Sequence, residues 1–257
     1  MMTHEELHEL LDTLHDRYNR PEFIEADPIS VPHAFSRPED IEISGFLAAT
    51  IAWGNRRTIV RNARRLLALM DGAPHDFTLN ATEREMLPLL NFVHRTFNGT
   101  DAVAFVRALR PFYADGGTLG DFFAAEYARH GDMRPVLAAF RERFFAGEHP
   151  PRCEKHLSSA ASGAACKRLN MYVKWMVRRD DRGVDFGLWN GVPASALYLP
   201  LDVHTAGMGR ALGLLTRRQN DWRAVEEITA ALRRFDPADP VRYDFALFGA
   251  GISGYLK

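Results

Sequence analysis

The chain has 257 residues, of which 46% are hydrophobic and 25% charged, and its 32 basic and 33 acidic side chains give a formal net charge of −1. This composition is typical of a soluble globular protein, and no apolar run reaches the ~18 residues that a membrane span requires. We expect a single domain in the cytoplasm, with no membrane partner, because the acidic N-terminal residues do not resemble an export signal. Two cysteines, Cys153 and Cys166, are too few for a four-thiolate zinc or iron–sulfur site, and we expect no metal or other cofactor.

The apolar periodicity predicts helices along almost the whole chain. The first begins at a capping box of Thr3 and Glu6, and a proline-rich loop over 28–38 precedes the second, which carries the apolar run 45–53. Asp202 and Asp239 are expected to cap two of the later helices. The remaining helices are expected over 58–70, 81–97, 101–113, 118–130, 132–145, 163–179, 203–214, 221–234 and 240–250. Without sustained strand alternation, the predicted fold class is all-α, a compact bundle.

Basic side chains gather in two segments of this nearly neutral chain. Residues 56–65 hold five arginines and no acid, and residues 151–182 hold eight basic side chains against three acidic ones. Such a distribution favours local docking on phosphates over binding by bulk charge. The alternative is that these arginines form ordinary solvated helix surfaces.

Lysine is used sparingly, which draws attention to Lys167. The chain has 28 arginines and only four lysines, Lys155, Lys167, Lys174 and Lys257. Unlike arginine, lysine can lose its proton and act as a nucleophile. Lys167 lies in the first turn of the predicted 163–179 helix, where the helix dipole and the Lys174 charge both favour the neutral amine. The alternative is a solvated lysine on a polar face.

Asp202 is the second candidate catalytic residue. It follows the apolar–proline step Leu199-Pro200-Leu201, 35 residues after Lys167. A carboxylate at this point can accept a proton from a nucleophile or stabilise a developing cation, although a helix cap is the simpler role. His204, two residues on, is a candidate for binding a phosphate or a plain surface histidine.

These residues resemble the helix-hairpin-helix DNA glycosylases. In that superfamily a catalytic lysine begins a helix and an aspartate follows an apolar–proline segment. The stretch 200–204, Pro-Leu-Asp-Val-His, is similar to the Pro-Val-Asp-Val-His of 8-oxoguanine glycosylases, and the Lys167–Asp202 spacing is similar to that of the archaeal 8-oxoguanine enzymes. Those enzymes also repeat a lysine seven residues on, as Lys174 does here. The hairpin stretch 159–166 departs from the family, because it has one glycine where a Leu-Pro-Gly-Val-Gly turn is usual.

A second resemblance covers nearly the whole chain. It is to an uncharacterised bacterial family catalogued as domain of unknown function 2400, which implies no activity by itself. The stretches that carry it are 27–29, 40–43, 52–54, 167–172, 175–178, 185–189 and 239–246.

The glycosylase resemblance implies a two-lobed, monomeric DNA repair enzyme acting on duplex DNA with a damaged base, for which an oxidised purine is the closest match. The implied lobes are 46–184 and 1–45 plus 185–257, within one domain over 1–257. Lys167 attacks the sugar, Asp202 assists, and a Schiff base permits a lyase step. The residues expected to contact DNA are Asn55, which fills the gap left by the flipped base, with Arg56, Arg57, Arg168, Lys174 and His204. The aromatic side chains expected to stack on the base are Trp189, Phe245 and Phe248.

Three other functions remain open from the sequence. One is a non-catalytic nucleic-acid-binding relative on the same scaffold. Another is a metal-dependent hydrolase, to which the ten histidines and the His75–Asp76 pair point, although no convincing set of partner ligands accompanies them. The third is a structural or interaction module.

Overall fold

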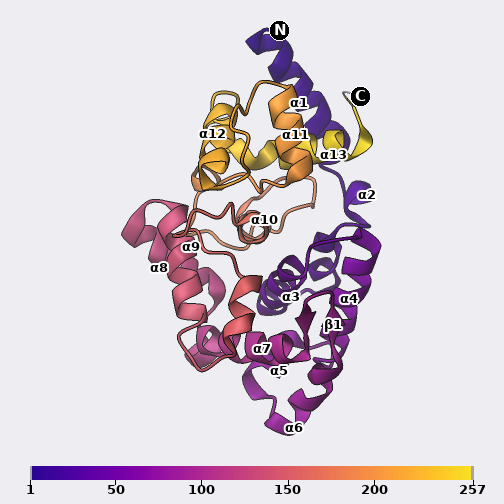
Figure 1. Ribbon diagram of the computed structural model, residues 1–257, viewed down its shortest axis with the longest axis vertical. Helices are drawn as coiled ribbons and strands as arrows, with labels where there is room; N and C mark the ends of the chain where they lie inside the picture. The colour runs from indigo at the N-terminus through magenta and orange to yellow at the C-terminus, as the bar shows by residue number, and fades with distance from the viewer. Residues whose placement is uncertain (1, 256–257) are drawn as a thin grey trace.

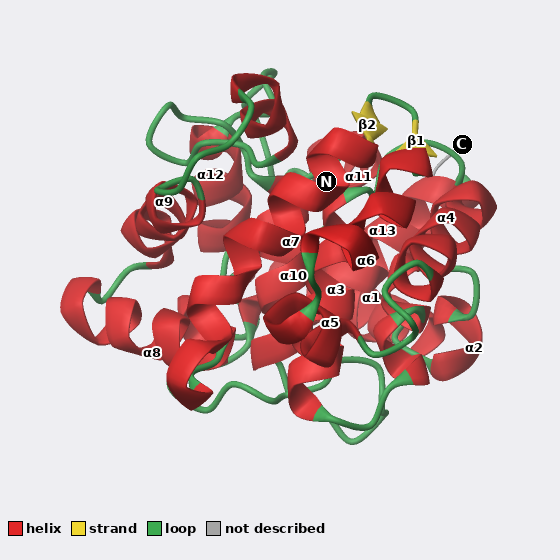
Figure 2. Cartoon of the chain, turned by 90° about the horizontal axis from the view of Figure 1, so that it is seen from below, coloured by secondary structure: helices red, strands yellow, loops and turns green. Residues whose placement is uncertain are grey.

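The computed structural model describes residues 2–255, and its regular structure is almost entirely helical. Figure 2 shows helices throughout the molecule and two short strands at one edge. The expected all-α class is confirmed. The α-helices are α1 His4–Tyr18, α2 Pro21–Ile24, α3 Pro38–Thr50, α4 Arg56–Ala68, α5 Pro74–Asn80, α6 Glu83–Met86, α7 Gly99–Tyr113, α8 Leu119–His130, α9 Met133–Phe144, α10 Lys167–Val177, α11 Val203–Ala211, α12 Trp222–Leu232 and α13 Asp244–Ser253.

Short 3-10 helices and one hairpin join these elements. Strands β1 Val93–His94 and β2 Phe97–Asn98 pair antiparallel. The 3-10 helices are η1 Pro28–Ser30, η2 Pro32–Ala34, η3 Leu87–Asn91, η4 Ala114–Gly116, η5 Pro151–His156, η6 Ala194–Ala196 and η7 Pro240–Tyr243.

Two of the predicted caps form as expected. Thr3 and Glu6 make both hydrogen bonds of a capping box at α1, and the Asp202 side chain caps α11. The predicted cap at Asp239 is wrong. Its carboxylate makes no capping hydrogen bond and instead accepts one from Arg178 Nε at 2.7 Å, while the chain after it starts as the 3-10 helix η7 before α13.

The helix predicted over 81–97 is also wrong. The segment divides into α6, η3 and the β1–β2 hairpin. Pro88 stands at the start of η3 and removes a backbone donor, and Arg95 adopts φ 54° in the turn between the strands. Both features are incompatible with a continuous α-helix.

α10 lies at the centre of the molecule. Figure 1 shows it between a group formed by α1, α11, α12 and α13 and a second group that includes α3 to α9. α10 packs on α3, while α13 packs on both α1 and α11. Close approach of α1 and α13 depends on Gly249, because a Cβ there would lie 2.4 Å from the Tyr18 ring. Every residue from Leu169 to Val177 is buried, so only the first turn of α10 reaches a surface. The lobe boundaries expected from the sequence stay a prediction.

No helix within the described part of the chain is both long and apolar enough to cross a membrane.

Candidate active site

One side of α10 faces a small pocket at its N-terminal end. Lys167 is the first residue of the helix, and Met171 and Trp175 follow at i+4 and i+8, which places all three on the same face. The Lys167 ammonium lies 3.2 Å from Met171 Sδ. Lys167 is half-buried, whereas Trp175 is fully buried. The helix therefore offers one partly exposed amine beside the side chains of Met171 and Trp175.

Three segments distant in sequence complete the pocket. The loop before α11 and the first turn of α11 contribute Pro200, Asp202 and Thr205, and the start of α13 contributes Asp244, Phe245 and Phe248. Asp27, just before η1, closes the remaining side. The free volume is about 20 Å³, room for about one water molecule. A nucleobase can enter only if part of this lining moves.

Lys167 and Asp202 meet in this pocket, although 35 residues separate them in sequence. Asp202 Oδ1 accepts hydrogen bonds from the backbone N–H groups of His204 and Thr205, each at 2.9 Å. Among the described residues, no protein group donates to Asp202 Oδ2, and no ion pair joins the carboxylate to Lys167. The cap thus fixes the carboxylate while leaving one oxygen for chemistry.

Asp244 is a pocket residue that the sequence analysis missed. Burial raises its pKa to about 6, against the opposing charges of Lys174 and Lys167. Asp244 Oδ2 lies 3.4 Å from the Lys174 ammonium. No spacing pattern could have found it, because it enters the site through the packing of α13 beside α10.

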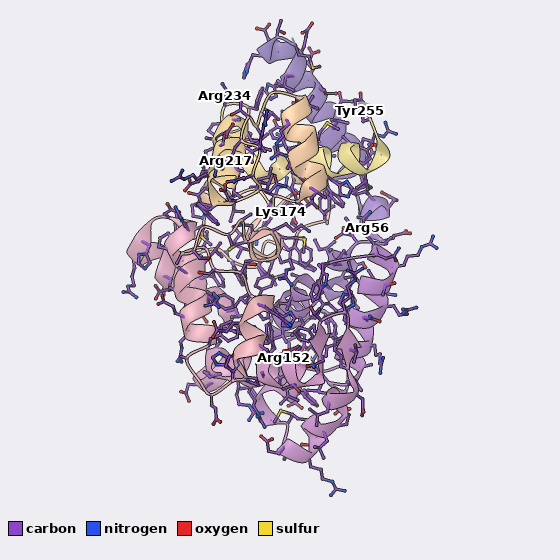
Figure 3. All side chains as sticks on the ribbon, viewed as in Figure 1. Arg56, Arg152, Lys174, Arg217, Arg234 and Tyr255 are labelled. Carbon is purple, nitrogen blue, oxygen red and sulfur yellow. The ribbon has the colours of Figure 1, made fainter. Side chains whose placement is uncertain are left out.

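Lys174 does not share the site of Lys167. Its side chain is 1% exposed, with Nζ 3.1 Å from Asp185 Oδ1, and it packs over the Phe245 ring at 4.2 Å from the centroid. Figure 3 shows Lys174 near the middle of the molecule. The prediction that Lys174 contacts DNA is therefore wrong for this structure. Seven residues span about 1.9 helical turns and rise about 10 Å along the axis, so Lys174 lies deeper in the molecule, where the carboxylates of Asp185 and Asp244 contact it.

The segment before α4 lies beside the first turn of α10. Arg168 donates a hydrogen bond to the Thr50 carbonyl, and its guanidinium lies over the Trp53 ring, 5.0 Å from the centroid. Burial lowers the pKa of Arg168 to about 10. This side chain holds the two segments together, and its expected role in DNA contact stays a prediction.

Arg56 borders the pocket and has a protein partner. Its Nη2 donates to Asp27 Oδ2 at 2.7 Å, and its guanidinium lies over the Phe248 and Phe23 rings at 5.1 and 5.4 Å. Asn55 and Arg57 are exposed at the same turn, and Asn55 Oδ1 caps α4 by accepting from Thr58 N at 3.2 Å. Asn55 is thus a helix cap whose expected role in DNA stays a prediction.

Of the three aromatic side chains expected to stack on a base, two lie in the pocket and one does not. Phe245 and Phe248 line the pocket, and the exposed His204 ring lies edge-on to Phe248 at 6.1 Å. Trp189 lies elsewhere. It stacks on Phe123 at 4.6 Å, and its Nε1 donates to Glu42 at 2.6 Å. The prediction that Trp189 stacks on a base is therefore wrong.

A family-model comparison covers most of the chain. Residues 27–253 match the model described as Protein of unknown function (DUF2400). The chain belongs to this family. A comparison with curated proteins and one with solved structures found no match. Four of the seven stretches on which the sequence resemblance rested, namely 27–29, 167–172, 175–178 and 239–246, include a residue that lines the pocket.

The two basic segments differ in the structure. α4 exposes Arg57, Arg61, Arg64 and Arg65 along one side. In 151–182 several charges are instead satisfied internally. Arg152 is paired with Asp101, and Arg178, which is buried, is paired with Asp180, Asp185 and Asp239. Exposed arginines without an ion pair to a described residue therefore gather on α4, and the expected docking on phosphates stays a prediction.

Trp175 and Thr205 are further pocket residues that the sequence analysis missed. The spacing along the predicted helix could have identified Trp175, because it follows Lys167 at i+8, on the same side as Met171 at i+4. No such spacing could have identified Thr205. Within residues 2–255, no group of three or more His, Cys, Asp and Glu side chains is arranged to hold a metal ion.

Proposed function

We propose that this protein is a DNA repair glycosylase with lyase activity, which removes a damaged base, such as an oxidised purine, through a Schiff base on Lys167. The observation that carries the proposal is the single pocket that joins an accessible amine, a fixed carboxylate and two aromatic rings. These are the groups that such a reaction requires: a nucleophile, a proton acceptor and surfaces on which a planar base can stack.

The chemistry begins with the neutral Lys167 amine. Its nitrogen attacks the sugar C1′, the bond from C1′ to the base breaks, and the base leaves with the bonding electron pair and takes up a proton. Asp202, held by its two backbone hydrogen bonds, accepts the proton released from the lysine nitrogen. Opening of the sugar ring gives an iminium ion between Lys167 and C1′. Loss of a C2′ proton then breaks the C3′–O bond, which is the lyase step.

The surroundings suit a duplex that approaches from the α4 side. The exposed arginines of α4 can neutralise phosphates, and Asn55 stands at the turn between them and the pocket. His204 follows Asp202 at the exposed start of α11. The whole chain carries a formal charge of −1, so this arrangement predicts a small phosphate footprint.

Borohydride trapping tests the proposal. Reduction of the iminium ion leaves a stable amine bond between protein and DNA. Wild type and Lys167→Gln are compared on a duplex containing 8-oxoguanine, with an abasic-site duplex alongside. Lys155→Gln is the matched control, because Lys155 is an exposed lysine that does not line the pocket. A covalent complex that forms with wild type and with Lys155→Gln, but not with Lys167→Gln, is the expected result.

The other outcomes separate the alternatives. Trapping at the abasic site alone, still dependent on Lys167, would keep the lysine chemistry and exclude 8-oxoguanine as the substrate. If neither duplex is trapped while the folded protein still binds DNA, the non-catalytic nucleic-acid-binding relative is the correct assignment.

A further inference from the structure

Two residues that line the pocket each carry a buried polar atom without a hydrogen-bond partner among residues 2–255. Trp175 is fully buried and Thr205 is 1% exposed, and both line the pocket. In the described part of the chain, neither Trp175 Nε1 nor Thr205 Oγ1 has a hydrogen-bond partner. Buried donors and acceptors are nearly always paired, and leaving one unpaired costs about 1–3 kcal/mol. The pocket wall therefore holds hydrogen-bonding capacity that the protein itself does not use.

The two atoms differ in what they can bind. An indole N–H can only donate, whereas a threonine hydroxyl can donate or accept. A ligand group that satisfies both must accept a hydrogen bond from Trp175. A carbonyl oxygen, with two lone pairs, can accept from both at once, whereas an exocyclic amino group in the same place would direct its N–H towards the indole N–H.

Trp175 and Thr205 lie on the same two helices that position Lys167 and Asp202. Trp175 is fixed in α10, two repeats from Lys167, and Thr205 is fixed in the first turn of α11, three residues from Asp202. The backbone N–H of Thr205 is bound by the Asp202 carboxylate at 2.9 Å, which holds this turn against the pocket. The recognising groups thus sit on the same rigid elements as the two reacting groups.

We propose that Trp175 and Thr205 determine specificity by donating hydrogen bonds to a carbonyl oxygen of the flipped base, so that the pocket accepts 6-oxopurines and rejects 6-aminopurines. This inference rests on the proposed function and adds its substrate class. Adenine-type bases carry an N6 amino donor where guanine-type bases carry the O6 acceptor. A site built to bind such a group discriminates strongly against an analogue that lacks it.

The test compares two lesions that share the same oxidised C8. Equilibrium binding is measured for duplexes containing 8-oxoguanine, 8-oxoadenine or an abasic site, and for an undamaged duplex. Thr205→Val removes the hydroxyl at nearly constant shape, Thr205→Ser retains it, and Trp175→Phe removes the indole donor. Tyr172→Phe is the matched control, because Tyr172 also carries a buried hydroxyl without a described partner on α10 but does not line this pocket.

The expected result is a wild-type preference for 8-oxoguanine over 8-oxoadenine. Thr205→Val and Trp175→Phe should each reduce this preference by about 5- to 10-fold, while abasic-site binding is unchanged. Thr205→Ser and Tyr172→Phe should retain the preference. Equal preference in wild type and Thr205→Val, or tighter wild-type binding of 8-oxoadenine, would overturn the inference and leave the proposed function standing. A folded wild type that binds all lesions no better than undamaged duplex would instead overturn the proposed function, and the inference with it.

Discussion

Asp202 combines two roles that a single substitution can separate. Its Oδ1 caps α11 through two backbone N–H groups, while Oδ2 accepts no hydrogen bond from the protein within residues 2–255, and the residue lines the pocket. Asparagine caps helices about as well as aspartate but cannot accept a proton at neutral pH. The cap and the chemistry therefore depend on different properties of one side chain.

We predict that Asp202→Asn unfolds at nearly the wild-type urea concentration but forms the Lys167-dependent adduct at least about 100-fold more slowly. Asp202→Ala should show the same chemical defect and also lose about 1 kcal/mol of folding stability, because the cap is gone. Urea unfolding and the rate of borohydride trapping measure the two effects. Near wild-type trapping by Asp202→Asn would assign Asp202 to the cap alone.

At the scale of elements, α4 and η1 meet at the pocket through Arg56 and Asp27. The ion pair is 2.7 Å long, with the Arg56 side chain 29% and the Asp27 side chain 8% exposed. The guanidinium also lies over Phe248, another part of the lining. The pocket has room for about one water molecule in this conformation, so it must open before it can bind a base. We expect the opening to break the contact between Arg56 and Asp27. A DNA phosphate can replace Asp27 as the partner of Arg56.

We predict that Asp27→Asn and Arg56→Gln each increase the rate of Lys167 modification in the free protein by about 5-fold, because loss of a partly exposed ion pair shifts the opening equilibrium by up to about 1 kcal/mol. The measurement is reductive methylation with formaldehyde and cyanoborohydride, followed by peptide mass spectrometry with the exposed Lys155 as internal reference. Arg217→Gln, which breaks an Arg–Asp pair away from the pocket, is the control. Unchanged Lys167 modification in both pocket variants would show that this pair does not control access.

At the scale of the whole molecule, a buried charge cluster ties α10 to the segments around it. The cluster consists of Lys174, Arg178, Asp185, Asp239 and Asp244. Lys174 contacts Asp185 and Asp244, and Arg178 contacts Asp185 and Asp239. Through these contacts the last turns of α10 are joined to the loop after it and to the start of α13, which contributes Asp244, Phe245 and Phe248 to the pocket.

Removing one member of this cluster should destabilise the entire fold. We predict that Lys174→Met lowers the free energy of unfolding by about 3–5 kcal/mol, because it leaves two buried carboxylates with less compensation. Lys167→Gln, on the same helix but half-buried and outside any ion pair with described residues, should change it by less than about 0.5 kcal/mol. Urea denaturation compares the two variants with wild type. A Lys174→Met protein as stable as wild type would show that the cluster does not carry this role.

The sequence by itself determined the class of fold and identified Lys167 and Asp202, the two residues to which the proposed chemistry is assigned. Helical periodicity and caps are local properties, so the all-α class, the capping box at Thr3 and the cap at Asp202 could be predicted from neighbouring residues alone. The rarity of lysine similarly singled out Lys167. The same local reasoning failed over 81–97, where Pro88 and the hairpin turn at Arg95 divide an apparently helical stretch.

Only the tertiary structure decided which charges are buried and which residues surround the amine. Lys167 and Lys174 share a helix, yet one faces the pocket and the other is enclosed by aspartates from distant segments. Asp27, Thr205 and Asp244 reach the pocket from η1, α11 and α13, which no spacing along the chain relates to α10. Burial and long-range pairing depend on how the helices pack against one another, and that packing is what turns one unusual lysine into a candidate active site.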